Sequence, residues 1–140
     1  MRVYARILEN ALPCINLRLA TRKLSAIYDA ALEPLGINIA QYHLLRTINQ
    51  HQPVSLTELG RLAELDRSTI GRNVRVLERI GLVEMGRGDA DQREAQVSLS
   101  RSGRNLLRKA TPIWERCQED FVSRLGHDKI NALSLTLDAI

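Results

Sequence analysis

The chain has few of the residues that build disulfide scaffolds or metal sites. Its 140 residues include two cysteines, Cys14 and Cys117, and two are too few for a disulfide framework. Neither cysteine lies in a CxxC pair, and the three histidines (His43, His51 and His127) are scattered along the chain. The sequence therefore predicts no metal site and no cofactor.

Long apolar runs and catalytic constellations are also absent. No stretch approaches the ~18 apolar residues of a membrane span, and the first ten residues lack the apolar core of a signal peptide. We therefore expect a cytoplasmic protein that does not enter a membrane, in a compartment where thiols are normally reduced. Paired carboxylates, a Ser/His/Asp set and a glycine-rich phosphate loop are missing at workable spacing, so the sequence does not predict an enzyme.

What the chain does have is an ordinary globular composition with an excess of cations. Apolar residues make up 44% and charged residues 26%, which is typical of one soluble domain, here residues 1–140. Twenty Lys and Arg residues against 16 Asp and Glu residues give a net charge of +4. A basic chain favours a polyanionic partner, because neutralised phosphates release counterions.

Apolar periodicity and capping residues predict mainly helices. The capping pairs are Asn38 with Gln41 and Ser55 with Glu58, and Pro112 predicts a kink or a boundary in the long helix after Ser100. The expected helices are 12–35, 38–49, 56–63, 67–80, a long helix from 101, and a last helix from 127 or 128. Two short strands, 82–85 and 96–99, flank a polar segment with glycines at 86 and 88, which is typical of a hairpin.

A short helix, a tight turn, a second helix and a hairpin form a winged helix-turn-helix. The expected fold is mainly α with a small β-hairpin wing. The DNA-binding lobe spans about 38–100, and the segments 1–37 and 101–140 supply flanking dimerisation helices. Each flanking helix carries an apolar stripe that must be buried against another surface.

The second helix of this motif is the one that enters the major groove. At about 100° per residue, its polar face lies opposite Ile70, Val74 and Leu77. Arginine, asparagine and hydroxyl side chains on such a face can pair with base edges or phosphates. The predicted DNA contacts are Ser68, Thr69, Arg72, Asn73, Arg75 and Arg79 from the helix, and Arg87, Asp91 and Arg93 from the hairpin.

The segment from Asp91 to Gly103 resembles the wing signature of the MarR family, which is D-x-R followed by V-x-L-(T/S)-x-x-G. The preceding segment 66–83 is similar to that family's recognition helix and first wing strand. The resemblance covers nearly the whole chain. It implies a homodimer that binds a pseudo-palindromic site on double-stranded DNA and, in most members, represses transcription.

The N-terminal part resembles the branch of this family that senses organic hydroperoxides. Cys14 opens the first helix, where free backbone N–H groups favour a thiolate, and Arg18 follows one turn later. The resemblance implies that Tyr28 supports the thiol and that Cys117 of the other chain is a resolving cysteine. Ile39 and Arg18 stand where that branch has tyrosines in some or all members, so another oxidant, or no redox role, stays open.

Two further alternatives remain at this point. A small aromatic inducer could bind between the dimer helices and the DNA-binding lobe, with Tyr28, Tyr42 and His43 as candidate pocket residues. Trp114 is expected to anchor the dimer core rather than to contact a ligand. The alternative to a DNA-binding regulator is a winged helix that serves as a protein-interaction module without an inducer.

Overall fold

The structure is a computed structural model that describes residues 12–87 and 95–140. Most of its elements are helices, and three short strands form one sheet. The helices are α2 (Pro13–Leu32), the 3-10 turn η1 (Glu33–Leu35), α3 (Ile39–His51), α4 (Leu56–Ala63), α5 (Arg67–Arg79), α6 (Arg101–Leu125) and α7 (His127–Asp138). The strands are β1 (Val54–Ser55), β2 (Val83–Arg87) and β3 (Ala95–Leu99).

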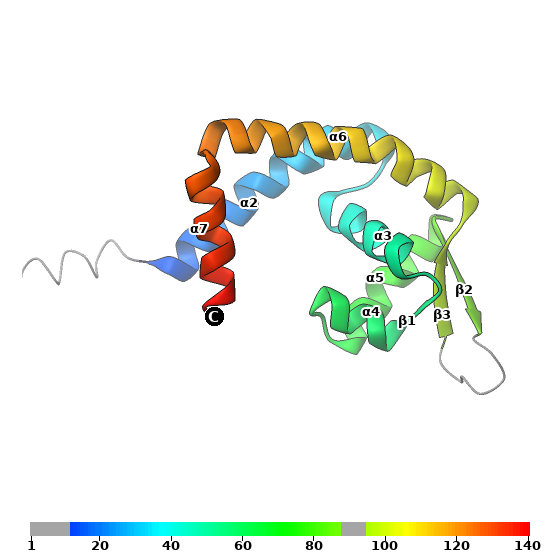
Figure 1. Cartoon of the computed structure of the whole chain (residues 1–140). Coiled ribbons are helices and arrows are strands. Elements are labelled where there is room, and N and C mark those ends of the chain that lie inside the picture. Colours follow the sequence, from blue (N-terminus) through cyan, green and yellow to red (C-terminus); the bar gives the residue numbers. More distant parts are fainter. Residues whose placement is uncertain (1–11, 88–94) are drawn as a thin grey trace, which may run out of the picture.

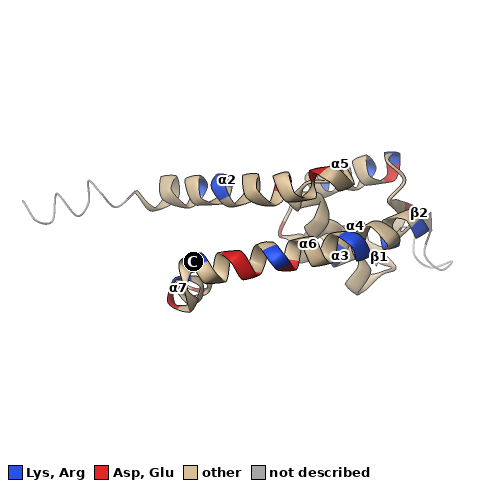
Figure 2. Ribbon diagram, turned by 90° about the horizontal axis from the view of Figure 1, so that it is seen from above, with Lys and Arg blue, Asp and Glu red and all other residues tan. Residues whose placement is uncertain are grey.

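The long helix α6 supports the rest of the molecule. Helix α2 lies alongside it, and α7 turns back from its C-terminal end towards the start of α2 (Figure 1). Seen from above, α2 and α6 run side by side (Figure 2). The lobe formed by α3, α4, α5 and the sheet packs beneath the other end of α6 (Figure 1). This arrangement confirms a mainly helical winged helix-turn-helix with helices at both ends. Within the described residues, no helix is long and apolar enough to cross a membrane.

Side-chain caps determine where the helices begin, as the sequence predicts. The Asn38 side chain accepts a hydrogen bond from the Gln41 backbone N–H (2.8 Å), and the Gln41 side chain accepts one from the Asn38 N–H (3.0 Å), which completes the capping box. Ser55 caps α4 in the same way through the Glu58 N–H. One partner lies outside the local sequence: the Asp29 carboxylate accepts from the Ile39 N–H (2.8 Å) and so ties α2 to the start of α3.

The sheet has one strand more than the sequence predicts. The order is β1-β3-β2, all antiparallel, with Val54 opposite Val97 and Val83 opposite Leu99. Strand β1 has only two residues, too few for an alternating pattern to be recognised. The Gln52 side chain accepts a hydrogen bond from the Leu99 N–H at 2.9 Å and extends this contact beyond the strand. The wing is therefore attached to the lobe along its third strand.

The junction between the wing and α6 depends on a close backbone approach. The Ser100 hydroxyl accepts from the Gly103 N–H (3.0 Å) and donates to the Gly81 carbonyl (2.6 Å), which joins the start of α6 to the end of α5. A Cβ on Gly103 would overlap the Leu82 carbonyl oxygen. This contact gives a physical reason for the glycine at the end of the wing signature.

Of the kink or boundary expected at Pro112, the boundary is wrong, because α6 runs unbroken from Arg101 to Leu125. Proline removes one backbone donor from a helix. In the same turn the Thr111 hydroxyl donates to the Leu107 carbonyl at 2.8 Å. Buried Leu107, Ala110 and Cys117 hold the helix in place on both sides of the proline.

Trp114 joins α6 to the lobe within one chain. Its ring stacks on Tyr42 of α3 with centroids 5.6 Å apart, and the Arg46 guanidinium lies 4.6 Å from the Trp114 ring centroid. The Tyr42 hydroxyl lies 3.2 Å from the Thr111 hydroxyl. The sequence predicted Trp114 as a dimer-core anchor and did not predict these contacts, because they join residues about 70 positions apart.

Candidate nucleic-acid interface

Helix α5 is held against α4 by a tight turn that leaves one long face exposed. Glu64 adopts a left-handed conformation (φ 53°), and the Leu65 N–H donates to the Gly60 carbonyl at 2.9 Å. A Cβ on Gly60 would lie 3.0 Å from the Leu65 carbonyl oxygen, so a larger residue would strain this turn. The geometry is that of a helix-turn-helix, in which the second helix is the one presented to DNA.

The buried and exposed faces of α5 are those predicted from its periodicity. Ile70, Val74 and Leu77 are at most 1% exposed and face the lobe core. Thr69 is half-buried. The other predicted contact residues of this helix are exposed: Ser68, Arg72, Asn73, Arg75 and Arg79. Their exposure leaves these side chains available to a partner, and their contact with DNA stays a prediction.

The first turn of α5 is organised by the Asp66 carboxylate. It accepts hydrogen bonds from the Thr69 backbone N–H (2.7 Å) and from the Ser68 hydroxyl (2.8 Å). These bonds, with a smaller effect from the Arg72 charge, lower the pKa of Asp66 to about 2. Because the Ser68 hydroxyl hydrogen is used for the cap, its oxygen remains available only as an acceptor.

A groove along α5 gathers more positive charge than the sequence analysis predicted. Its volume is about 650 Å³, and its lining residues are Arg67, Ser68, Gly71, Arg72 and Arg75. Arg67 is absent from the predicted contacts because it lies nearer the core side of the helical wheel. Its spacing of four residues from Gly71 and eight from Arg75 was the signal that could have identified it.

The predicted wing contacts are only partly described. Arg87 is the last residue of β2, opposite Ala95 of β3, so its backbone lies on the part of the wing nearest the tip. Asp91 and Arg93 lie outside the described residues.

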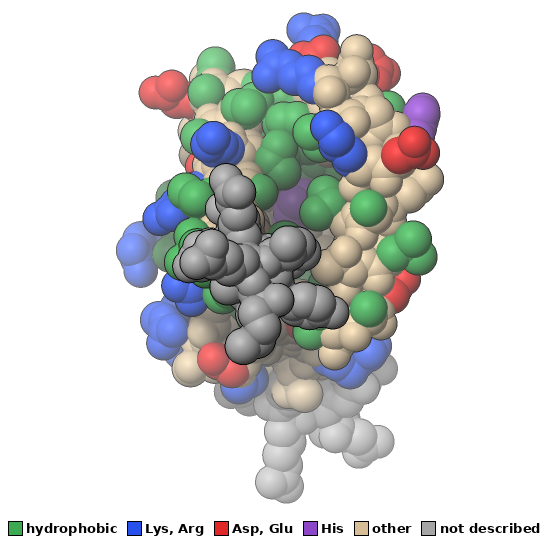
Figure 3. Space-filling view, turned by 90° about the vertical axis from the view of Figure 1, so that its left-hand side faces the viewer, with side chains coloured by type: hydrophobic (Ala, Val, Ile, Leu, Met, Phe, Trp, Pro, Cys, Tyr) green, Lys and Arg blue, Asp and Glu red, His purple; other side chains and the backbone are tan. Residues whose placement is uncertain are grey.

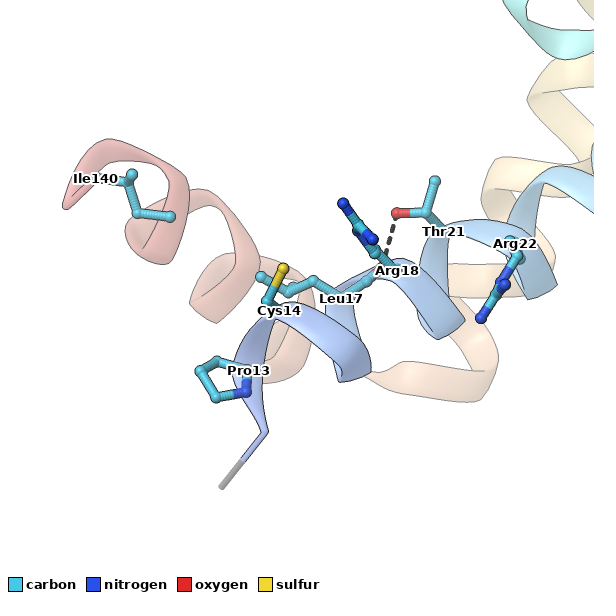
Figure 4. Close-up of a pocket in the computed structure, with 7 residues that line it drawn as sticks. All are labelled: Pro13, Cys14, Leu17, Arg18, Thr21, Arg22 and Ile140. Carbon is cyan, nitrogen blue, oxygen red and sulfur yellow. Dashed lines mark hydrogen bonds between the residues drawn. The ribbon is translucent and has the colours of Figure 1, made fainter. Parts of the chain in front are cut away.

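The predicted thiol site lies at the opposite end of the molecule. Cys14 is exposed in the first turn of α2, directly after Pro13. It lines a pocket of about 660 Å³ between the start of α2 and the end of α7 (Figure 4). Arg18 and Ile140 belong to the same pocket. This pocket brings together the predicted cysteine and its expected cationic neighbour.

Tyr28 does not reach Cys14 within one chain. The two residues are fourteen positions apart on one helix, which separates them by about 21 Å at 1.5 Å per residue. The Tyr28 ring packs against Phe121 with centroids 5.2 Å apart, and its hydroxyl donates to the Gln118 side chain. Burial, and then the charge of nearby Cys117, raise the pKa of Tyr28.

Cys117 belongs to the Tyr28 end of α2 and not to the Cys14 end. It is 8% exposed. Burial raises the pKa of its thiol, the Asp120 charge adds to this effect, and the Arg116 charge opposes it. A raised pKa leaves less reactive thiolate. Since Cys117 lies beside Tyr28, a bond between the two cysteines requires two chains.

The three candidate pocket residues each have aromatic neighbours within the single chain. Tyr42 is fully buried and belongs to the hydrophobic core, and the Tyr28 ring packs against Phe121 of α6. His43 is exposed, and its ring centroid lies 6.0 Å from that of Tyr42. Partial burial, and then the charge of Arg46, lower the pKa of His43.

The fold and this surface define a winged helix-turn-helix protein with helical extensions at both ends. Known proteins place it more narrowly. A model of the MarR family matches residues 37–95. The organic hydroperoxide resistance transcriptional regulator of Bacillus subtilis is 30% identical over 106 residues, which span 76% of this chain and 71% of the relative.

Solved structures agree with this assignment. The Mycobacterium tuberculosis transcriptional regulator MosR in complex with DNA is 32% identical, with a TM-score of 0.77 over 91% of this chain and 96% of its own. A mutant MarR from E. coli complexed with operator DNA has a TM-score of 0.84 at 20% identity, covering 95% of this chain and 96% of its own, which shows a shared fold. The chain belongs to the MarR family.

Proposed function

We propose that this protein is a homodimeric transcriptional regulator that binds double-stranded DNA through α5 and the wing. The observation that carries the proposal is the exposed cationic face of α5, held outwards by buried Ile70, Val74 and Leu77. Relatives named as transcriptional regulators support it. A winged helix used only for protein contact has no need of an arginine-rich face, and nothing in the family points to an enzyme.

The dimer is proposed from apolar side chains that one chain leaves exposed. Green hydrophobic side chains gather over the end of the molecule that α2 and α7 form (Figure 3). Exposed apolar residues in these two helices or directly beside them include Leu12, Ile15, Leu17, Leu19, Leu133, Leu135, Leu137 and Ile140. Contiguous apolar patches of this kind mark interaction sites. Segments 1–37 and 101–140 would interlock in a two-fold dimer, which calls for a pseudo-palindromic operator.

The proposed mode of action is repression in the cytoplasm, released by an oxidant at Cys14 or by a small ligand. A second chain that places Tyr28 or Cys117 beside Cys14 would complete the thiol site across the dimer. The pocket at Cys14 already supplies an exposed sulfur and the cationic Arg18.

DNA binding is tested by fluorescence anisotropy with a duplex from upstream of the protein's own gene. The reduced protein should bind tightly, and affinity should fall steeply with salt because phosphate contacts release counterions. Arg72→Ala should weaken binding about five- to 150-fold, since a good base contact accounts for roughly 1–3 kcal/mol. Arg108 is an exposed residue of α6, far along the chain from α5, so Arg108→Ala is the matched control and should bind DNA as the wild type does. Equal affinity of both variants would contradict the assignment of α5.

The inducer is tested by repeating the titration after mild peroxide treatment. Loss of binding that a reductant restores, and that Cys14→Ser abolishes, supports the thiol switch. Release by peroxide in Cys14→Ser would contradict it. Binding indifferent to peroxide would direct the search to small ligands.

A further inference from the structure

We infer that Gly71 of α5 is a cradle for a DNA backbone phosphate, and that Arg67 is a further DNA-contact residue beside it. The inference rests on the proposed function and extends it, because neither residue belongs to the face predicted from the sequence.

Gly71 has no structural reason to lack a side chain. Glycine is among the least favourable residues in the interior of a helix, and Gly71 lies in the second turn of α5. Gly60 and Gly103 are required by backbone atoms that a Cβ would crowd. At Gly71 a Cβ would meet only the Arg67 Nη1 atom, at 3.5 Å, which is ordinary van der Waals contact at the end of a flexible side chain. The fold would accept alanine here.

Gly71 lines the groove and is itself buried, with the Arg67 Nη1 atom beside the position that a Cβ would take. Arg67, Arg72 and Arg75 line the groove together with Ser68, and the Arg67 guanidinium is the one that lies within 4 Å of the missing side chain. Two acidic residues flank Gly71 along α5. The Asp66 carboxylate, which accepts from the Ser68 hydroxyl at 2.8 Å, lies at the N-terminal end of the groove, and Glu78 lies seven residues or about 10 Å further along the axis.

A phosphate fits this arrangement better than a base edge does. Guanidinium groups bind phosphate oxygens through paired hydrogen bonds, and a glycine lets a backbone approach a helix more closely than any other residue. On the helical wheel Arg67 lies nearer the buried face of α5 than Arg72 does, so it is placed to contact a different part of the DNA. Such contacts fix the position of a recognition helix without carrying sequence information.

The test compares Gly71→Ala and Arg67→Ala with the wild type in three measurements: thermal unfolding, operator affinity and affinity for an unrelated duplex. Gly71→Ala should unfold at the same or a higher temperature, because alanine favours the helix, yet bind both duplexes about tenfold more weakly. Arg67→Ala should lower the affinity for both duplexes by the same factor. It should also reduce the slope of log affinity against log salt by about 1. Arg67→Lys should retain most of that slope.

The outcomes separate this inference from the function on which it rests. A wild type that binds no DNA would overturn both. The cradle alone would be overturned if the wild type binds DNA, Arg72→Ala weakens that binding, and Gly71→Ala and Arg67→Ala bind as the wild type does. Loss confined to the operator duplex would also overturn it, because the groove would then contact bases.

Discussion

Single residues in this chain are constrained by backbone contacts as much as by side chains. Gly103 and Gly86 illustrate the difference, since both lie near the wing. A Cβ on Gly103 would overlap the Leu82 carbonyl oxygen, whereas a Cβ on Gly86 would have nothing within 4 Å.

Gly103→Ala should therefore destabilise the protein by about 1–3 kcal/mol, the usual cost of overpacking. Urea unfolding followed by circular dichroism measures the free energy of unfolding. Gly86→Ala is the control and should unfold near the wild-type midpoint. Wild-type stability of Gly103→Ala would show that α6 does not approach Leu82 as closely as described.

Asp66 allows a prediction about pH. Its folded pKa of about 2 lies below the ordinary value of 3.8, so its cap stabilises the fold above that ordinary value and is lost as pH falls towards 2. Asp66→Ala should lower the melting temperature at pH 7, and the difference from the wild type should shrink at pH 2. Asp66→Asn keeps a capping oxygen, so its melting temperature at pH 7 should fall less than that of Asp66→Ala. A difference that is independent of pH would contradict the role of the carboxylate.

At the scale of elements, the joint between α3 and α6 decides how the lobe is held. The Tyr42 hydroxyl is positioned to donate to Thr111, whose own hydroxyl hydrogen goes to the Leu107 carbonyl. The Trp114 ring stacks on the Tyr42 ring, and the Arg46 guanidinium lies over the Trp114 ring. The joint thus combines a polar contact with a packed aromatic surface.

Tyr42→Phe should reduce the free energy of unfolding by about 1 kcal/mol, the usual net contribution of one hydrogen bond. Thr111→Val should have a similar effect. In the double variant the losses should not add, because both single changes remove the same interaction. Additive losses in urea unfolding would show that the two hydroxyls do not interact.

At the scale of the whole molecule, α7 shows how one chain is incomplete. Ile130, Leu133 and Leu137 follow the spacing i, i+3, i+7 and so lie on one face of α7, and Ile140 follows two residues after the helix ends. Leu137 and Ile140 are 71% and 92% exposed in the single chain. This face is the part of α7 that a second chain would cover.

Leu137→Asp should shift the protein towards monomer in sedimentation velocity, because the interface would have to bury an unpaired charge. DNA affinity should fall with it, since one chain contacts only one half-site. Gln50→Asp places the same charge on the exposed surface of α3, away from α2 and α7, and should leave the dimer intact. A dimer that tolerates Leu137→Asp would place the interface elsewhere.

Much of the fold was decided by signals that act over a few residues. The caps at Asn38 and Ser55 use hydrogen bonds to backbone groups three positions away, so the sequence alone located these two helix starts. The same is true of the exposed face of α5, because a helix repeats every 3.6 residues and its buried positions determine its exposed ones.

The remaining features depend on contacts between distant segments. Strand β1 exists only because β3 lies beside it, and Trp114 packs on the lobe because α6 crosses α3. Cys14 and Tyr28 share a helix, and only the position of α6 shows that Cys117 belongs with Tyr28. The sequence by itself determined the order of elements and the cationic helix, through local periodicity. Tertiary structure decided which side chains meet and where a glycine leaves space, because those depend on packing between elements.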